Sequence, residues 1–354
     1  MSEQNLTTAR PILFRVAVAA VVGIVLAVAI GVGAIRMLTN VDPWPVLSAV
    51  NVPLLALAVA SFILGNLFVG HRFLAMHPER TEASDRPWEV GSLIFASSTF
   101  SLVLPGPVGE FAAVAAMKKR YGLDPAIALA TAVHARLVGL ASAALVAAVA
   151  LPFVSVETEL GQILRLGALM LIGVGLGLGL LSSKPGWVRW FGDLLLRGAE
   201  RGGILGRALS GVAVFSSALA RVGQAPGKAW MKVLAWSVLI QSIHMMAIVF
   251  VAMALSLSPA WPGLLLAQGT GSLAIVVGIL LPGGLGTYEV AVISSMAGPG
   301  MLTVVSAGVV AVGMRVVHLL GLSSAGVLFA FWAKVLMSDD VAADVEQMKG
   351  SKAH

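Results

Sequence analysis

Cysteine is absent from this sequence of 354 residues, which excludes disulfide bonds and thiolate metal sites. Charged residues are also scarce, because they make up 11% of the chain, whereas soluble proteins contain roughly 25%. The chain contains instead 58% hydrophobic residues, many of them in long apolar runs. This composition predicts an integral membrane protein.

The sequence also lacks the motifs of several enzyme and binding classes. No zinc-ligand spacing, catalytic triad, P-loop or Rossmann fingerprint occurs in a fitting context, so we expect no metal, no cofactor and no catalytic residue. The formal net charge of +6 does not indicate nucleic acid, because the basic residues are dispersed through the loops between apolar runs. We therefore expect neither an enzyme nor a nucleic-acid-binding protein.

Six apolar runs are long enough to cross the bilayer, which takes about 20 helical residues. They are residues 16–35, 46–70, 123–152, 163–182, 233–257 and 302–333. Two further runs, residues 91–104 and 265–281, stop early at Leu-Pro-Gly, and each is followed by a second short apolar piece. Such interrupted pairs predict re-entrant hairpins, which enter and leave the membrane on the same side.

Lysine and arginine predict the orientation of the chain. If the N-terminus is cytoplasmic and the short pairs do not cross, 19 of the 23 basic residues lie in cytoplasmic segments, and Arg72 is counted among them. This asymmetry follows the positive-inside rule and places both termini in the cytoplasm. In the connection at residues 183–230, basic and apolar residues alternate at helical spacing. We expect it to lie along the cytoplasmic face as a basic amphipathic segment, or else as a solvated connector.

One motif occurs twice in the chain. The stretches "LPGPVGEF" and "LPGGLGTYEV" both contain a glutamate after the glycines, Glu110 in the first copy and Glu289 in the second. Each glutamate is followed, after the same interval in both copies, by an arginine within an apolar run, Arg136 or Arg315. The equal interval indicates an internal duplication.

The two copies are separated by three predicted crossings, which puts them on opposite faces of the membrane. Repeat 1, at about residues 91–152, and repeat 2, at about residues 265–333, therefore form an inverted repeat, a recurrent transporter design. The predicted fold is a single all-α polytopic membrane domain over residues 1–354, with six full spans and two re-entrant helical hairpins.

Helix-breaking residues explain why the hairpins would carry a site. The predicted breaks are Pro105, Gly106, Gly109, Pro282, Gly283, Gly284 and Gly286. A break within the hydrocarbon frees backbone groups that must bond to a polar site or a water-filled cavity. Glu110 and Glu289 follow the breaks, near a helix N-terminus that favours a carboxylate.

Arg136 and Arg315 each need a partner, because an arginine within a span costs roughly 2.5–3.5 kcal/mol on insertion scales unless it is paired or hydrated. That partner is either the glutamate of the same repeat or an anionic headgroup that competes for the guanidinium. We therefore predict that Glu110, Arg136, Glu289 and Arg315 bind substrate. The alternative is that they form buried ion pairs that only lock the hairpins.

Other polar residues lie within apolar segments, namely His134, His244, His318, Gln241 and Gln268. His318 shares a helix face with Arg315 at spacing i, i+3, which makes it the better site candidate among the histidines. We add His318 and Gln268 to the predicted substrate-binding residues. For any one of these side chains, a satisfied hydrogen bond in the core is the simpler interpretation.

The motifs "LPGPVGEF", with "KKRYG" after it, and "PGGLGTYE" resemble the transmembrane region of the lysylphosphatidylglycerol synthase family, which also occurs as stand-alone proteins. Pro107 and Val108 replace the small or basic residues often seen in the first motif. In that family the membrane region is taken to be a lipid flippase, whereas lipid aminoacylation belongs to a separate soluble domain. This chain ends at His354 without such a domain, so synthase activity is not expected.

The resemblance implies a lipid flippase in the cytoplasmic (inner) membrane of a prokaryote. It would move an anionic or glycosylated lipid headgroup through a central cavity formed by the two hairpins. The lipid partner would be a phospholipid, a polyprenyl-linked lipid or a hopanoid-type lipid, and a homo-oligomer is also compatible with the sequence. The alternatives are a proton-coupled carrier of a small soluble substrate and an intramembrane lipid-modifying enzyme.

Overall fold

The computed structural model describes residues 50–102, 108–153, 203–277, 286–297 and 302–351, with four isolated positions at 169, 173, 186 and 190. Within these ranges the regular elements are helices, and no sheet is formed. Four stretches are long and apolar enough to cross a membrane, namely Val52–Met76, Pro125–Phe153, Gly227–Ala254 and Val304–Leu328. They correspond to four of the six predicted spans. The predicted spans at 16–35 and 163–182 lie outside the described residues.

The first half of the described chain runs through α3 (Val52–Leu67), α4 (Val69–Met76), η1 (Glu82–Asp85), α5 (Pro87–Ser97), η2 (Ser98–Leu102), α6 (Val108–Tyr121), α7 (Pro125–Ala150) and η3 (Leu151–Phe153). Its long helices begin where the sequence provides caps. The side chain of Asn51 accepts from Leu54 N–H at 3.2 Å, and Asp124 accepts from Ile127 N–H at 2.9 Å. In both helices a proline follows the cap, where its missing N–H costs nothing.

The second half contains α10 (Gly203–Gly223), α11 (Gly227–Ala254), α12 (Trp261–Val277), α13 (Thr287–Met296) and α14 (Val304–Ser351). Helix α14 is longer than the predicted span at 302–333, because it continues as one helix to Ser351. Helix α10 lies within the predicted 183–230 connection and packs against α7. Its Ala218 and Val222 are buried there, so the apolar face of this segment contacts protein.

Each interrupted apolar pair contains two short helices. Helices α5 and α6 have 11 and 14 residues, and α12 and α13 have 17 and 10, so each is short for a full crossing. The predicted break residues Pro105, Gly106, Pro282, Gly283 and Gly284 lie outside the described residues. Gly109 lies in the first turn of α6, so it belongs to the start of the second helix rather than to the break. Gly286 precedes α13 with φ of 85°, a left-handed conformation that favours glycine.

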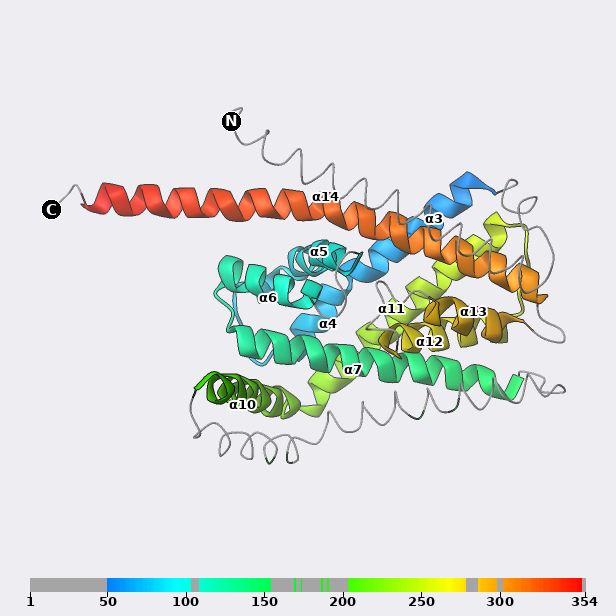
Figure 1. The fold of residues 1–354 in the computed structure, drawn as a ribbon, viewed down its shortest axis with the longest axis horizontal. Coiled ribbons are helices and arrows are strands. Elements are labelled where there is room, and N and C mark those ends of the chain that lie inside the picture. Colours follow the sequence, from blue (N-terminus) through cyan, green and yellow to red (C-terminus); the bar gives the residue numbers. More distant parts are fainter. Residues whose placement is uncertain are drawn as a thin grey trace.

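The elements of the two halves correspond in position and in packing. Helix α13 begins as many residues after α6 as α14 begins after α7, so the helices of the second half follow those of the first at one constant offset in sequence. Helix α7 packs against α12, and α14 packs against α5, so the long helix of each half contacts the hairpin of the other half. Helices α3 and α11, which precede the two hairpins, pack against each other. In Figure 1, α7 and α14 border the bundle, and the hairpin helices lie between them.

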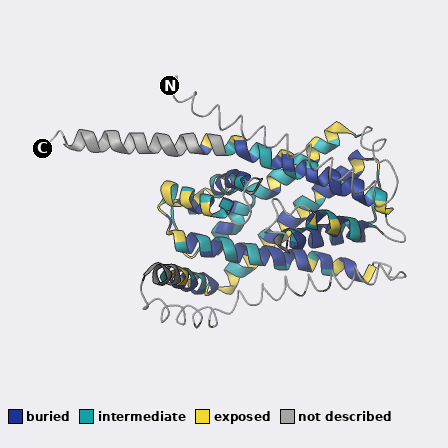
Figure 2. Ribbon diagram, in the orientation of Figure 1, coloured by how far each residue is buried: buried dark blue, intermediate teal, exposed yellow. Residues whose placement is uncertain are grey.

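The buried core consists of clusters that join the two halves. One cluster packs Ala58 of α3 against Ile248, Val292 and Met314 of α11, α13 and α14, and a second packs Phe73 and Leu93 of α4 and α5 against Trp332 of α14. Burial concentrates between the helices, whereas many outer positions are exposed (Figure 2). Several exposed positions carry large apolar side chains, as expected of spans that contact lipid.

Candidate functional site

The second Glu/Arg pair lies at the start of α13. Glu289 is the third residue of this helix, and one carboxylate oxygen, Oε2, accepts a hydrogen bond from Gly286 N–H at 2.8 Å. The other oxygen, Oε1, accepts from Arg315 Nε of α14 at 2.5 Å. The Arg315 side chain is only 6% exposed, and that of Glu289 is 20% exposed. The carboxylate therefore fixes the helix start and neutralises a nearly buried guanidinium.

A run of rings continues from this pair toward α3. The guanidinium of Arg315 lies 5.5 Å from the ring centroid of Tyr288, a cation–π distance. The Tyr288 ring contacts His318 at 4.8 Å, and His318 contacts Phe62 at 4.9 Å between ring centroids. His318 does lie on the same side of α14 as Arg315, as its spacing predicts, but its neighbours are rings. The guanidinium of this pair is thus covered by the Tyr288 ring, which His318 and Phe62 support from behind.

The first Glu/Arg pair occupies the equivalent position and has a more open setting. Glu110 is the third residue of α6, and its Oε1 is paired with Arg136 Nη1 of α7. The side chains of Arg136 and Glu110 are 41% and 28% exposed. Both glutamates therefore pair with the arginine of their own repeat, as the equal sequence interval predicts, but only the first pair is widely accessible.

A polar cluster lies beside the first pair, one helical turn away on α7. Gln241 of α11 donates from Nε2 to the carbonyl oxygen of Gly139 at 3.3 Å. Gln268 of α12 donates to Gln241 Oε1 at 2.6 Å and lies 3.1 Å from the hydroxyl of Ser272. Gln268, a predicted site residue, is therefore buried in a network of amides that reaches α7.

Arg72 is a site candidate that the sequence pattern misses. The positive-inside count places it in a cytoplasmic loop, whereas the structure places it in α4, within the candidate span Val52–Met76. Its Nη1 lies 2.5 Å from where a Cβ on Gly139 would stand, so the guanidinium fills the space that this glycine leaves. Its Nε is shielded from solvent and has no hydrogen-bond partner among the described residues. The signal that could have found it is its position only two residues past a predicted span end.

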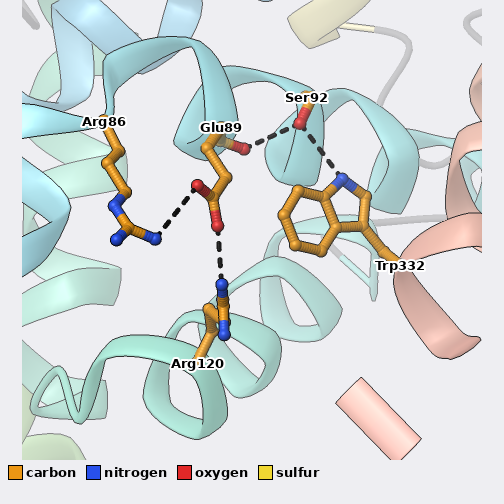
Figure 3. Close-up of polar contacts among 5 residues, drawn as sticks. All are labelled: Arg86, Glu89, Ser92, Arg120 and Trp332. Carbon is orange, nitrogen blue, oxygen red and sulfur yellow. Dashed lines mark hydrogen bonds and ion pairs between the residues drawn. The ribbon is translucent and has the colours of Figure 1, made fainter. Parts of the chain in front are cut away.

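The first hairpin is also anchored by charges near its outer end. Figure 3 shows Glu89 of α5 between Arg86 and Arg120; its carboxylate oxygens lie 3.5 Å and 3.2 Å from their guanidinium nitrogens. The hydroxyl of Ser92 donates to the Glu89 carbonyl at 2.8 Å and accepts from the indole N–H of Trp332 at 3.1 Å. These contacts join α5 to α6 and to α14, and they are structural rather than part of the candidate site.

The other two histidines predicted within apolar segments, His134 and His244, have neighbours typical of a core. His134 is buried, and its Nδ1 lies 3.0 Å from the carbonyl oxygen of Ala130. His244 stacks on Phe62, and its Nε2 lies 3.5 Å from Asn66 Nδ2. Among the described residues, no group of three or more histidine, aspartate or glutamate side chains is placed to hold a metal ion.

The comparisons with known proteins give one match. No curated protein and no solved structure matches the chain. A family model described as "Lysylphosphatidylglycerol synthase TM region" matches residues 13–326, which is most of the chain. With four apolar helices long enough to span a membrane among its described residues, and with paired charges between its helices, this integral membrane protein belongs to the lysylphosphatidylglycerol synthase transmembrane region family.

Proposed function

We propose that the protein translocates a lipid headgroup, anionic or glycosylated, across the cytoplasmic membrane, without altering the lipid chemically. The observation that carries the proposal is the pair of equivalent ion pairs, Glu110 with Arg136 and Glu289 with Arg315, each at the start of a short helix after a break. Membership of the family supports the same function. The lipid is a phospholipid, a polyprenyl-linked lipid or a hopanoid-type lipid.

The arrangement of the two halves supports an inverted repeat of re-entrant hairpins. The helix starts recur at a constant offset in sequence, and the two halves exchange their contacts, since α7 packs on α12 and α14 on α5. Two contacts also correspond. By that same offset, Gln241 is the equivalent of Phe62, and His318 is the equivalent of Gly139. Phe62 contacts His318, and Gln241 contacts Gly139, so equivalent positions meet in both contacts. Each hairpin would then enter from its own side, so that two half-sites meet near mid-depth.

The unequal exposure of the two ion pairs fits alternating access. The pair of Glu110 and Arg136 is accessible, whereas Arg315 is nearly buried beside Tyr288. In our proposal a headgroup competes with the glutamate for the arginine on the open side, because a guanidinium binds phosphate and carboxylate in the same planar manner. Closing that side and opening the other would pass the headgroup on while its acyl chains stay in lipid.

The test is a scrambling assay with purified protein in liposomes that contain acyl-labelled phosphatidylglycerol. An impermeant quencher reaches only the outer leaflet, so extra quenching reports movement of lipid from the inner leaflet. We expect wild-type protein to move the lipid and the variants Arg315→Gln and Glu289→Gln to be slower by about tenfold or more, the loss expected when a charge-assisted contact is removed. Unchanged rates in both variants would reject the site.

A variant in which Glu289 and Arg315 exchange places tests whether the pair binds substrate or only holds the hairpin together. The double variant Glu289→Arg with Arg315→Glu keeps an ion pair between α13 and α14 but moves the cation to the other helix. It also loses the bond from Gly286 N–H to Glu289, which costs about 1 kcal/mol of stability, well short of unfolding the protein. If the pair only locks the hairpin, this variant should scramble lipid like wild type. Our proposal expects it to retain a cooperative melting transition and to lose transport. Arg80→Gln, at an exposed position paired with Asp85, serves as the matched control.

A further inference from the structure

We propose that Arg72 and Arg136 together form the binding site for the phosphate group of the transported headgroup, on the open side of the first half-site. The inference rests on the proposed function, since it names the chemistry of the ligand that the first Glu/Arg pair receives. It adds a third arginine to the two Glu/Arg pairs and makes the two half-sites unequal.

The two guanidinium groups are brought together by Gly139. Arg136 and Gly139 are three residues apart on α7 and therefore share a face of that helix. Arg72 reaches the same face from α4, with its Nη1 against Gly139. The two charges are close enough to repel each other, a repulsion that an anion between them would reverse.

The charges at the first half-site do not balance. Arg136 is paired with Glu110, but Arg72 has neither an ion pair nor a side-chain hydrogen bond to any part of the chain that the structure describes. An unpaired arginine within an apolar span is costly, so a chain that retains one is expected to use it. Within the described part of the chain, the first half-site therefore carries one excess positive charge.

The second half-site has no such excess. The position equivalent to Arg72 in the second half is Val251, which packs in the apolar core beside Gly313. Arg315 is neutralised by Glu289 and flanked by Tyr288. An anionic headgroup is thus favoured by charge at the first half-site, which is also the accessible one.

A neutral donor lies beside Gly139. Gln241 Nε2 gives one of its two N–H groups to the carbonyl of Gly139, and Gln268 and Ser272 hold the Gln241 side chain in place through its Oε1. A phosphate has acceptor oxygens beyond the two or three that guanidinium groups satisfy, and the second N–H of Gln241 suits one of them. A phosphate therefore uses this set of donors more fully than a carboxylate does.

The test measures binding by the protein in mild detergent, separately from transport. The probe is a soluble short-chain phosphatidylglycerol, and the diacylglycerol of the same chain length, which lacks phosphate, is the comparison ligand. We expect Arg72→Gln to weaken phosphatidylglycerol binding by about tenfold or more and to leave diacylglycerol binding unchanged. Arg80→Gln, the matched surface control, should bind both as wild type does. Equal phosphatidylglycerol affinity in wild type and Arg72→Gln would overturn the proposal.

Two further measurements keep the result unambiguous. Inorganic phosphate is titrated as a second probe: weak binding compared with the lipid supports a headgroup site, whereas equal affinity would overturn the assignment to lipid. Gly139→Ala is a second variant, because its methyl group meets only the flexible end of Arg72 and should displace the guanidinium without disturbing the backbone. It should weaken phosphatidylglycerol binding too, and wild-type affinity in this variant would count against the site.

The melting temperature of Arg72→Gln distinguishes a binding role of Arg72 from a structural role, because the two roles predict opposite changes. If Arg72 binds ligand at a cost to the fold, Arg72→Gln should melt at the same temperature as ligand-free wild type or at a higher one. A lower melting temperature with unchanged binding would instead make Arg72 a structural residue. If phosphatidylglycerol binding depends on Arg72 but wild-type protein scrambles no lipid, the proposed function is rejected and this inference stands. If wild-type protein scrambles lipid but Arg72→Gln binds phosphatidylglycerol normally, this inference is rejected and the proposed function stands.

Discussion

Replacing Glu289 with alanine should destabilise the protein far more than replacing Glu110, although the two residues occupy equivalent positions. Glu289 pairs with an arginine that is almost buried, and it also accepts from Gly286 N–H. Removing one partner of a buried pair costs about 3–5 kcal/mol, because the remaining charge is left uncompensated. Glu110 pairs with a side chain that is 41% exposed, and exposed pairs contribute about 0–1 kcal/mol.

The expected difference between the two variants is therefore about 2–5 kcal/mol in the free energy of unfolding. It can be measured by equilibrium unfolding in mixed micelles of a mild detergent and dodecyl sulfate, followed by the fluorescence of the eight tryptophans. Glu82→Ala, at an exposed position in η1, is the control and should change stability by less than about 0.5 kcal/mol. Equal losses for Glu289→Ala and Glu110→Ala would refute the claim that the two half-sites differ in enclosure.

Three smaller predictions follow from single contacts. Gly286→Ala should cost about 1–2 kcal/mol, because φ of 85° is strained for alanine; unfolding in mixed micelles checks this, and an unchanged midpoint would contradict it. Trp332→Phe removes the indole hydrogen bond to Ser92 and should cost about 1 kcal/mol in the same assay; a stability equal to that of wild type would show that the bond has no net value. Burial lowers the pKa of His77 below its ordinary value of 6.5. As the pH drops below about 6.5, His77 therefore binds a proton in the unfolded chain before it does so in the folded protein, and the stability of the fold should decrease. His77→Gln should weaken that dependence of the melting temperature on pH, and an identical pH profile would argue against the assignment.

The sequence predicts the local construction of the candidate site well. Proline, glycine and capping residues set where α7 and α13 begin, and each glutamate meets its arginine as the equal Glu-to-Arg interval predicts. These are short-range constraints, because neighbouring helices in a hairpin have little freedom once the break and the caps are fixed. The same reasoning explains why four of the predicted spans recur as apolar helices.

The surroundings of the two pairs could not be predicted in this way. Helices in a membrane are apolar on all sides, so their sequences give no periodic signal of which face meets protein and which meets lipid. The contacts of Phe62 with His318 and of Arg72 with Gly139 join helices distant in sequence and depend on how α3 and α4 pack. The difference in exposure between the two ion pairs arises from the same packing.

The most direct test of the central claim is the side of the membrane from which each hairpin helix start is reached. Single cysteines at Val108 and Thr287, in a chain that has no other cysteine, can be labelled with an impermeant maleimide in vesicles of both orientations. An inverted repeat predicts that position 108 is labelled from the cytoplasmic side and position 287 from the opposite side. Labelling of both positions from one and the same side would contradict the paired half-sites, and with them the proposed route for a headgroup.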